Sequence, residues 1–241
     1  MTKEVKPYNE VGSKKQQVAE MFDNISERYD LLNHLLSLSI DKGWRRKVVR
    51  MASEGKPKLI LDVATGTADL AIALKKAHPE KITGIDISAG MLSVGRTKIA
   101  KKKLSSLITL EQADSEDLPF ADDTFDAITV AFGVRNFENL KKGLSEMRRV
   151  LKPGGRLLVL EFSQPRSFPF KQIYNFYFKY VLPTIGKLVS KDSRAYTYLP
   201  ESVQAFPYGD AFRKILAEVG YETGRVIPVT FGIATIYEGR K

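Results

Sequence analysis

The stretch from Leu59 to Leu70, LILDVATGTADL, constrains the fold of this chain more than any other. Apolar residues run into Asp62, a segment of small residues follows at 64–68, and a helical pattern resumes at Asp69. This order predicts a buried strand, a tight turn and a helix entered directly from the turn. Small residues and the free N–H groups of a helix start suit a nucleotide-like ligand at the first such turn of an open α/β sheet.

From Lys58 onward, strand-like and helix-like segments alternate, which predicts an α/β fold with a parallel sheet covered on both faces. We expect strands at Leu59–Val63, Ile82–Ile87, Ile108–Gln112, Ala127–Ala131, Leu157–Phe162, Val226–Thr230 and Ile233–Tyr237. We expect helices at Asp69–Ala77, Ala89–Lys102, Leu140–Leu151 and Asp210–Val219. Because only Phe231 and Gly232 separate the last two strands, these must form an antiparallel hairpin.

A mostly parallel sheet that ends in an antiparallel hairpin is typical of the Rossmann-like, seven-stranded sheet of class I methyltransferases. Apolar residues at helical spacing also predict helices before the first strand, at 14–29, Leu31–Leu38 and Lys42–Ala52. We expect a flexible tail at 1–13 and one domain over 14–241. Its parts are a helical cap at 14–56, a cofactor-binding core at 57–163, a helical insertion that forms a substrate lid at 164–209, and a final helix and hairpin at 210–241.

Composition narrows the possible partners. The chain has 38 Lys and Arg against 28 Asp and Glu, so its net charge of +10 suits nucleic acid, an anionic membrane surface or an acidic small molecule. The basic residues are scattered rather than gathered in a stripe, which disfavours a nucleic-acid binder or an RNA methyltransferase. With no Cys and two His, we expect no metal site. Neither a signal peptide nor a spanning apolar run is apparent, which predicts a cytoplasmic protein.

Several acidic residues are expected at the carboxyl edge of the sheet, where ligands bind in such folds. The loop at Asp62–Asp69 has one glycine, Gly66, so it departs from the dinucleotide fingerprint of a nicotinamide oxidoreductase. Asp86, at the end of the second strand, is placed to accept ribose hydroxyls, although a helix N-cap is the alternative. Asp114 and Ser115, after the third strand, can contact adenine, with a solvated loop as the alternative.

Candidate residues for chemistry follow the fourth strand in the segment FGVRN. Arg135 is placed there to stabilise a developing oxyanion and Asn136 to orient a substrate oxygen, and a surface salt bridge is the alternative for Arg135. Tyr29, Asp30 and Asn33 are polar residues within an apolar stretch, which indicates that they face a substrate.

Two longer stretches carry a specific resemblance. YDLLNHLLSLSIDKGW, at Tyr29–Trp44, and RVLKPGGRLLVLEFS, at Arg149–Ser163, are similar to the two signature stretches of the menaquinone and ubiquinone biosynthesis C-methyltransferases. The first departs at Leu32, where the family usually has Met, and at Asp41, where it usually has His. FGVRN, VLPTIGKLVS and YTYLPESV also resemble stretches of that family, so the resemblance covers nearly the whole chain.

The resemblance implies transfer of a methyl group from S-adenosylmethionine to a ring carbon of a polyprenylated quinol. It places cofactor contacts at Thr67, in the motif that includes Asp62 and Gly66, and at Asp86, Asp114 and Ser115 after the next two strands. We favour demethylmenaquinol as the acceptor, with a ubiquinone precursor or another small phenolic or lipid acceptor as the alternative. Ala131 stands where some members have Ser, so a side-chain contact from that position is lost.

The insertion after the fifth strand is dense in Phe and Tyr over 168–189. It is expected to form a groove for a polyprenyl tail, and core packing or the surface of a homodimer is the alternative. Lys171, Lys179 and Lys187 recur at eight-residue intervals, roughly one helix face, which predicts peripheral contact with anionic lipid.

Overall fold

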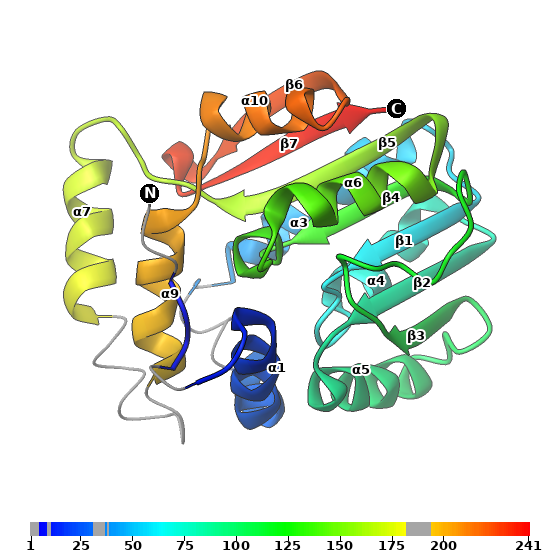
Figure 1. Ribbon diagram of the computed structural model, residues 1–241, viewed down its shortest axis with the longest axis horizontal. Coiled ribbons are helices and arrows are strands. Elements are labelled where there is room, and N and C mark those ends of the chain that lie inside the picture. The colour runs from blue at the N-terminus through cyan, green and yellow to red at the C-terminus, as the bar shows by residue number, and fades with distance from the viewer. Residues whose placement is uncertain (1–4, 9–10, 31–36, 38, 182–193) are drawn as a thin grey trace.

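The computed structural model describes residues 5–8, 11–30, 37, 39–181 and 194–241. A seven-stranded sheet has the order β3-β2-β1-β4-β5-β7-β6 (Figure 1). Its strands are β1 Leu59–Val63, β2 Lys81–Asp86, β3 Ile108–Gln112, β4 Phe125–Ala131, β5 Leu151–Phe162, β6 Glu222–Val229 and β7 Ala234–Arg240. Strands β1 to β5 pair in parallel, while β7 is antiparallel to both β5 and β6, which confirms the predicted sheet and hairpin.

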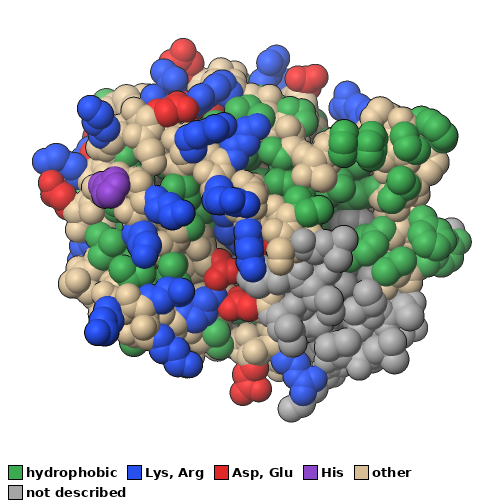
Figure 2. All heavy atoms as spheres, turned by 180° about the vertical axis from the view of Figure 1, so that it is seen from behind, with side chains coloured by type: hydrophobic (Ala, Val, Ile, Leu, Met, Phe, Trp, Pro, Cys, Tyr) green, Lys and Arg blue, Asp and Glu red, His purple; other side chains and the backbone are tan. Residues whose placement is uncertain are grey.

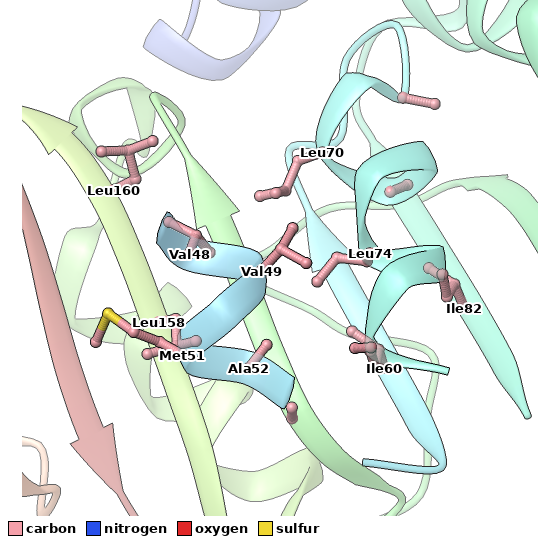
Figure 3. Close-up of a cluster of buried hydrophobic side chains, with 14 of the residues drawn as sticks. Val48, Val49, Met51, Ala52, Ile60, Leu70, Leu74, Ile82, Leu158 and Leu160 are labelled. Atoms are coloured by element: carbon pink, nitrogen blue, oxygen red, sulfur yellow. The ribbon is translucent and has the colours of Figure 1, made fainter. Parts of the chain in front are cut away.

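Helices cover both faces of this sheet. Helices α3 (Asp41–Ser53), α4 (Asp69–Leu74) and α5 (Ala89–Lys101) pack on one face, where Val48, Leu74 and Ile60 belong to one buried cluster (Figure 3). Helices α6 (Leu140–Val150) and α10 (Asp210–Glu218) pack on the other. Adjacent strand residues alternate between the two clusters because successive side chains of a strand point to opposite faces. Burial of such apolar surface stabilises the fold by roughly 25 cal/mol per Å².

Further helices stand together beyond the carboxyl ends of the parallel strands (Figure 1). They are α1 (Lys14–Ile25), α7 (Phe170–Phe176), which continues as a π-helical turn at Tyr177–Val181, and α9 (Arg194–Ala205). The predicted helix at Leu31–Leu38 falls almost entirely outside the described residues. In α1, the Ser13 side chain accepts from the Gln16 N–H and the Gln16 side chain accepts from the Ser13 N–H, a reciprocal cap that fixes where this helix begins.

Several predicted boundaries differ from the structure; β6, for example, begins at Glu222 rather than at Val226. The strand predicted to start at Leu157 starts earlier, because β5 begins at Leu151, directly after α6. Gly154 has a φ of +76°, and the pairing register with β4 shifts in this region, so the strand accommodates the irregularity without ending. The predicted helix Asp69–Ala77 is α4 followed by a 3₁₀ turn at Lys75–Ala77.

Candidate active site

A pocket opens at the carboxyl edge of the sheet, and we call it the edge pocket. The segments that follow β1, β2, β3 and β4 all contribute to its lining, through residues that include Gly66, Asp86, Asp114 and Gly133. The sequence predicted this edge as the binding site because parallel strands bring their carboxyl ends together. Of the predicted site residues, the lining contains Tyr29, Gly66, Asp86, Asp114, Ser115 and Asn136.

The loop after β1 has an unusual backbone. Ala64, Gly66 and Ala68 have φ values of +52°, +56° and +67°, and this left-handed conformation strains the two alanines. A Cβ atom added at Gly66 would meet nothing within 4 Å, so the loop leaves open space above this residue. A ligand can therefore approach the backbone there.

Asp62 lies beneath this loop and is absent from the lining of the edge pocket. Its carboxylate accepts hydrogen bonds from the hydroxyl groups of Thr65 and Thr129, each at 2.6 Å. Burial raises the pKa of Asp62 to about 6, against the opposing effect of these two hydrogen bonds. Asp62 therefore holds the loop in shape from below.

Asp86 ends β2 and lies in the wall of the edge pocket. Its carboxylate accepts from the backbone N–H groups of Gly66, at 2.8 Å, and Ser88, at 2.9 Å. Burial raises the pKa of Asp86, and these backbone contacts oppose the shift. The N-cap of α5 is Ser88, whose hydroxyl accepts from the Met91 N–H, so Asp86 is not the cap.

Helix α1 covers the edge pocket through contacts that no sequence pattern predicts. The Lys15 ammonium binds the carboxylate of Asp114 and lies 3.7 Å from that of Glu116. The Lys14 ammonium donates to two backbone carbonyls of the loop after β4, at 2.8 and 3.1 Å. Asp23 accepts from the Gly90 N–H at the start of α5. These polar contacts hold α1 over the loops that line the pocket.

A second, apolar cavity of about 310 Å³ lies between the helices at this end of the molecule, and we call it the apolar cavity. Its described lining comes mainly from α1, α3, α7, α9 and the segments after β4 and β5: Met21, Phe22, Ile25, Tyr29, Ser37, Ile40, Asp41, Trp44, Arg45, Phe132, Arg135, Phe162, Phe170, Ile173, Tyr174, Tyr177, Ala195, Tyr198, Leu199 and Ile233. Phe22, Tyr29 and Phe132 line both spaces, so the two adjoin at these residues.

Arg135 lies in the wall of the apolar cavity. Its guanidinium Nη1 is 2.8 Å from Glu161 Oε1, and the side chains of Arg135 and Glu161 are only 7% and 0% exposed. Burial raises the pKa of Glu161, and the charge of Arg135 opposes this. The predicted alternative was a surface salt bridge, whereas this ion pair is buried. Within the described part of the chain, the buried Nε of Arg135 has no hydrogen-bond partner.

Asn136 connects the two spaces. It lines the edge pocket, and its side-chain oxygen accepts from the hydroxyl of Tyr198, which lines the apolar cavity, at 3.2 Å. Tyr198 is 2% exposed and was missed as a site residue, although the stretch YTYLPESV that contains it was singled out. Its contact fixes the orientation of the Asn136 amide where the two spaces adjoin.

Thr67 and Asp30, two of the predicted site residues, contact each other and line neither cavity. The Thr67 hydroxyl donates to the carboxylate of Asp30, and the Lys98 ammonium lies 2.7 Å from the same carboxylate and also binds Asp69. They join the segment after α1 to the loop after β1. Asn33 lies outside the described residues.

Among the described residues, no group of three or more His, Cys, Asp or Glu side chains could hold a metal ion. In the same part of the chain, no helix is both long and apolar enough to cross a bilayer.

Known proteins with similar sequences cover almost the whole chain. The chain is 51% identical over 238 residues to the demethylmenaquinone methyltransferase of Bacteroides fragilis. The aligned region covers 98% of this chain and 97% of that protein. It is 49% identical over 230 residues to the ubiquinone/menaquinone biosynthesis C-methyltransferase UbiE of Geotalea daltonii, over 95% and 97% of the two chains.

Solved structures support the fold. A SAM-dependent methyltransferase from Aquifex aeolicus matches with a TM-score of 0.55 at 22% identity, over 76% of this chain and 81% of that chain. The family model described as the ubiE/COQ5 methyltransferase family matches residues 10–241. The chain therefore belongs to the ubiE/COQ5 methyltransferase family.

Proposed function

We propose that this protein methylates a ring carbon of demethylmenaquinol, with S-adenosylmethionine as the methyl donor. The observation that carries the proposal is that the two spaces are neighbours whose linings share Phe22, Tyr29 and Phe132. The edge pocket has polar and charged residues in its lining at the carboxyl edge of the sheet, and the lining of the apolar cavity is mainly aromatic and aliphatic. For the proposed transfer, the methyl group of a charged donor must lie against the ring carbon of the acceptor. The names of the similar proteins support a methyl transfer to a quinone-type acceptor.

The donor fits the edge pocket. In this proposal the Asp86 carboxylate accepts the ribose hydroxyls, and Asp114 and Ser115 contact adenine. The open space above Gly66 admits the rest of the donor close to the backbone. Asp62 and Thr67 contribute through the loop that their side chains hold, because neither lines the pocket. Lys15 must give up part of its contact with Asp114 when adenine binds.

The acceptor needs activation because carbon is a poor nucleophile. Loss of a phenolic proton places electron density on the neighbouring ring carbon, but a phenol has a pKa near 10. The buried Arg135 guanidinium stabilises the phenolate in a site of low dielectric, and Asn136 orients the ring oxygen. The ring carbon then takes the methyl group, the sulfur leaves with the bonding pair as a neutral thioether, and the C–H proton of that carbon passes by way of water to the ring oxygen, which restores the aromatic quinol.

The prenyl tail of such a substrate resides in a lipid bilayer, and the surface beside the apolar cavity suits contact with one. Hydrophobic side chains gather at the end of the molecule that contains α7 (Figure 2). Phe168, Ile173, Phe176 and Phe231 are 80%, 61%, 61% and 65% exposed. Since Ile173 also lines the apolar cavity, we propose that this surface touches the cytoplasmic face of the membrane and admits the tail.

Lys171 is exposed on α7 and supports contact with anionic headgroups, whereas Lys187 and the side chain of Lys179 lie outside the described residues. Flotation with vesicles that contain acidic lipid should recover the protein. A variant with Ile173→Ser and Phe176→Ser should stay behind, and a variant with Lys75→Ser and Lys76→Ser, away from α7, is the matched control. Absence of the wild-type protein from the vesicle fraction at low salt would exclude membrane contact.

The proposed reaction is tested with a panel of acceptors and S-adenosylmethionine labelled in its methyl group. Reduced demethylmenaquinone should accept label faster than a reduced ubiquinone precursor or a simple phenol. Preference for the ubiquinone precursor or the phenol would replace the proposed acceptor but keep the donor. Transfer to RNA alone would remove both the acceptor and the role of the apolar cavity.

A further inference from the structure

Asp41 places a carboxylate in the wall of the apolar cavity. It begins α3 and is 4% exposed. The Ser37 hydroxyl donates to Asp41 Oδ1 at 2.6 Å, and the Arg45 guanidinium, one helical turn later, binds Oδ2. Arg45 also lies 3.9 Å from Asp69 at the start of α4. The carboxylate is thus held in place by a hydroxyl and by a cation that is itself anchored.

This carboxylate differs in kind from its polar neighbours. Among the lining residues that the structure describes, Asp41 is the only carboxylate and no histidine is present. The other polar side chains of that lining all carry a hydrogen-bond donor: Ser37, Arg45, Arg135, Trp44, Tyr29, Tyr174, Tyr177 and Tyr198. An ionised carboxylate only accepts, so a ligand oxygen that meets Asp41 must bring a proton with it.

The two redox forms of a quinone differ in this property. A quinol has two hydroxyl groups, each of which donates and accepts, whereas a quinone has two carbonyl oxygens that only accept. Side-chain donors such as Arg135 bind the oxygens of either form. A carboxylate binds a hydroxyl and repels a carbonyl oxygen, whose lone pairs face its own. A site built to bond a hydroxyl therefore rejects the analogue that lacks the proton.

We propose that Asp41 makes the apolar cavity selective for the reduced form of the substrate by accepting a hydrogen bond from a quinol hydroxyl. This inference rests on the quinol acceptor of the proposed function. A carboxylate offers about four acceptor sites on its two oxygens, so a quinol hydroxyl can share an oxygen with the groups that already bind Asp41. Selection at binding keeps the unreactive oxidised form from occupying the site.

Trp44 offers a direct measurement because it is the single tryptophan of the chain and lines the apolar cavity. Quenching of its fluorescence gives the Kd of a short-chain demethylmenaquinone, oxidised or reduced with dithionite under anaerobic conditions, with S-adenosylhomocysteine present. The wild-type protein should bind the quinol at least about tenfold more tightly than the quinone, as expected for a hydrogen bond to a charged group. A tenfold preference corresponds to a bound midpoint potential raised by about 30 mV.

Two variants separate selection from a structural role. Asp41→Asn keeps the volume but adds a donor, so the preference should fall to within about threefold, through tighter quinone binding. Asp69→Asn alters the other contact of Arg45 without lining the cavity and should retain the wild-type ratio. A merely structural role would weaken both ligands equally and leave the ratio unchanged.

Equal affinity of the wild-type protein for both redox forms would overturn the inference, and this result needs no variant. So would an unchanged ratio in Asp41→Asn. If the wild-type protein methylates the quinol yet shows no preference at binding, the proposed function stands and this inference fails. If the protein prefers the quinol at binding but transfers no methyl group to it, this inference stands and the proposed function fails.

Discussion

Replacing Arg135 should damage both stability and turnover, and the structure separates the two effects. Glu161 is 0% exposed and Arg135 is its ion-pair partner at 2.8 Å. Arg135→Met therefore leaves a buried carboxylate without its cation, which costs about 3–5 kcal/mol of folding free energy. Loss of a donor that stabilises a developing oxyanion lowers kcat about 10²- to 10³-fold. A single variant cannot tell the second effect from the first.

The double variant Arg135→Met with Glu161→Gln removes both charges and should recover most of the lost stability, because a neutral pair of similar volume needs no desolvation of ions. Urea unfolding should place it within about 2 kcal/mol of the wild-type protein. Its kcat with reduced demethylmenaquinone should stay about 10²- to 10³-fold low. Glu161→Gln alone keeps the guanidinium and should retain more turnover than either variant at Arg135.

The readout is kcat at a temperature where urea unfolding shows every variant to be folded, together with the Kd for S-adenosylmethionine. The Kd should stay within about threefold of the wild-type value, because Arg135 does not line the edge pocket. A folded double variant with kcat within tenfold of the wild-type value would refute a catalytic role for Arg135. The ion pair would then be purely structural.

Three further outcomes are expected. Asp86→Asn should raise the Kd for S-adenosylmethionine about 10- to 100-fold in calorimetry, while Asp126→Asn, remote from the edge pocket, should not; equal losses would point to global damage. Because burial raises the pKa of Asp62 from 3.8 to about 6, its favourable contribution to folding is complete below about pH 4 and is lost as pH rises through about 6. The unfolding free energy of Asp62→Asn relative to the wild-type protein should thus rise by about 2 kcal/mol from pH 4 to 7 in urea titrations, and a flat difference would contradict this. Lys14→Met removes the two hydrogen bonds that the Lys14 ammonium donates to the loop after β4, so limited proteolysis within 14–25 should be faster unless the cofactor is bound; an unchanged rate would show that other contacts suffice.

The sheet and the location of the edge pocket were predictable because both depend on local patterns. Alternating apolar segments determine the strands, and the parallel connection brings Gly66, Asp86 and Asp114 to one edge. Asp86 was placed correctly at a strand end because strand ends are marked by where the apolar run stops. The predicted start of β5 failed because Gly154 reads as a turn, whereas the strand tolerates it as an irregularity.

Side-chain partners far apart in the sequence were not predictable. Asp30 was expected at the substrate but binds Lys98, which lies 68 residues along the chain. Likewise, Lys15 reaches Asp114 across 99 residues. Such contacts depend on how the helical cap sits on the core, which no periodicity encodes. The buried partner of Arg135 was missed for the same reason, since Glu161 lies within the apolar run of β5.

In the proposed reaction, a methyl group passes from the edge pocket to a ring carbon in the apolar cavity. The most direct test is to incubate the protein with reduced demethylmenaquinone and S-adenosylmethionine that carries a ¹³C-methyl group, and to identify the product by mass spectrometry and NMR. The proposed reaction predicts one ¹³C-methyl group bonded to ring carbon, which gives menaquinol. A methyl ether on a ring oxygen, or no labelled quinone product from a folded protein that binds the donor, would contradict it.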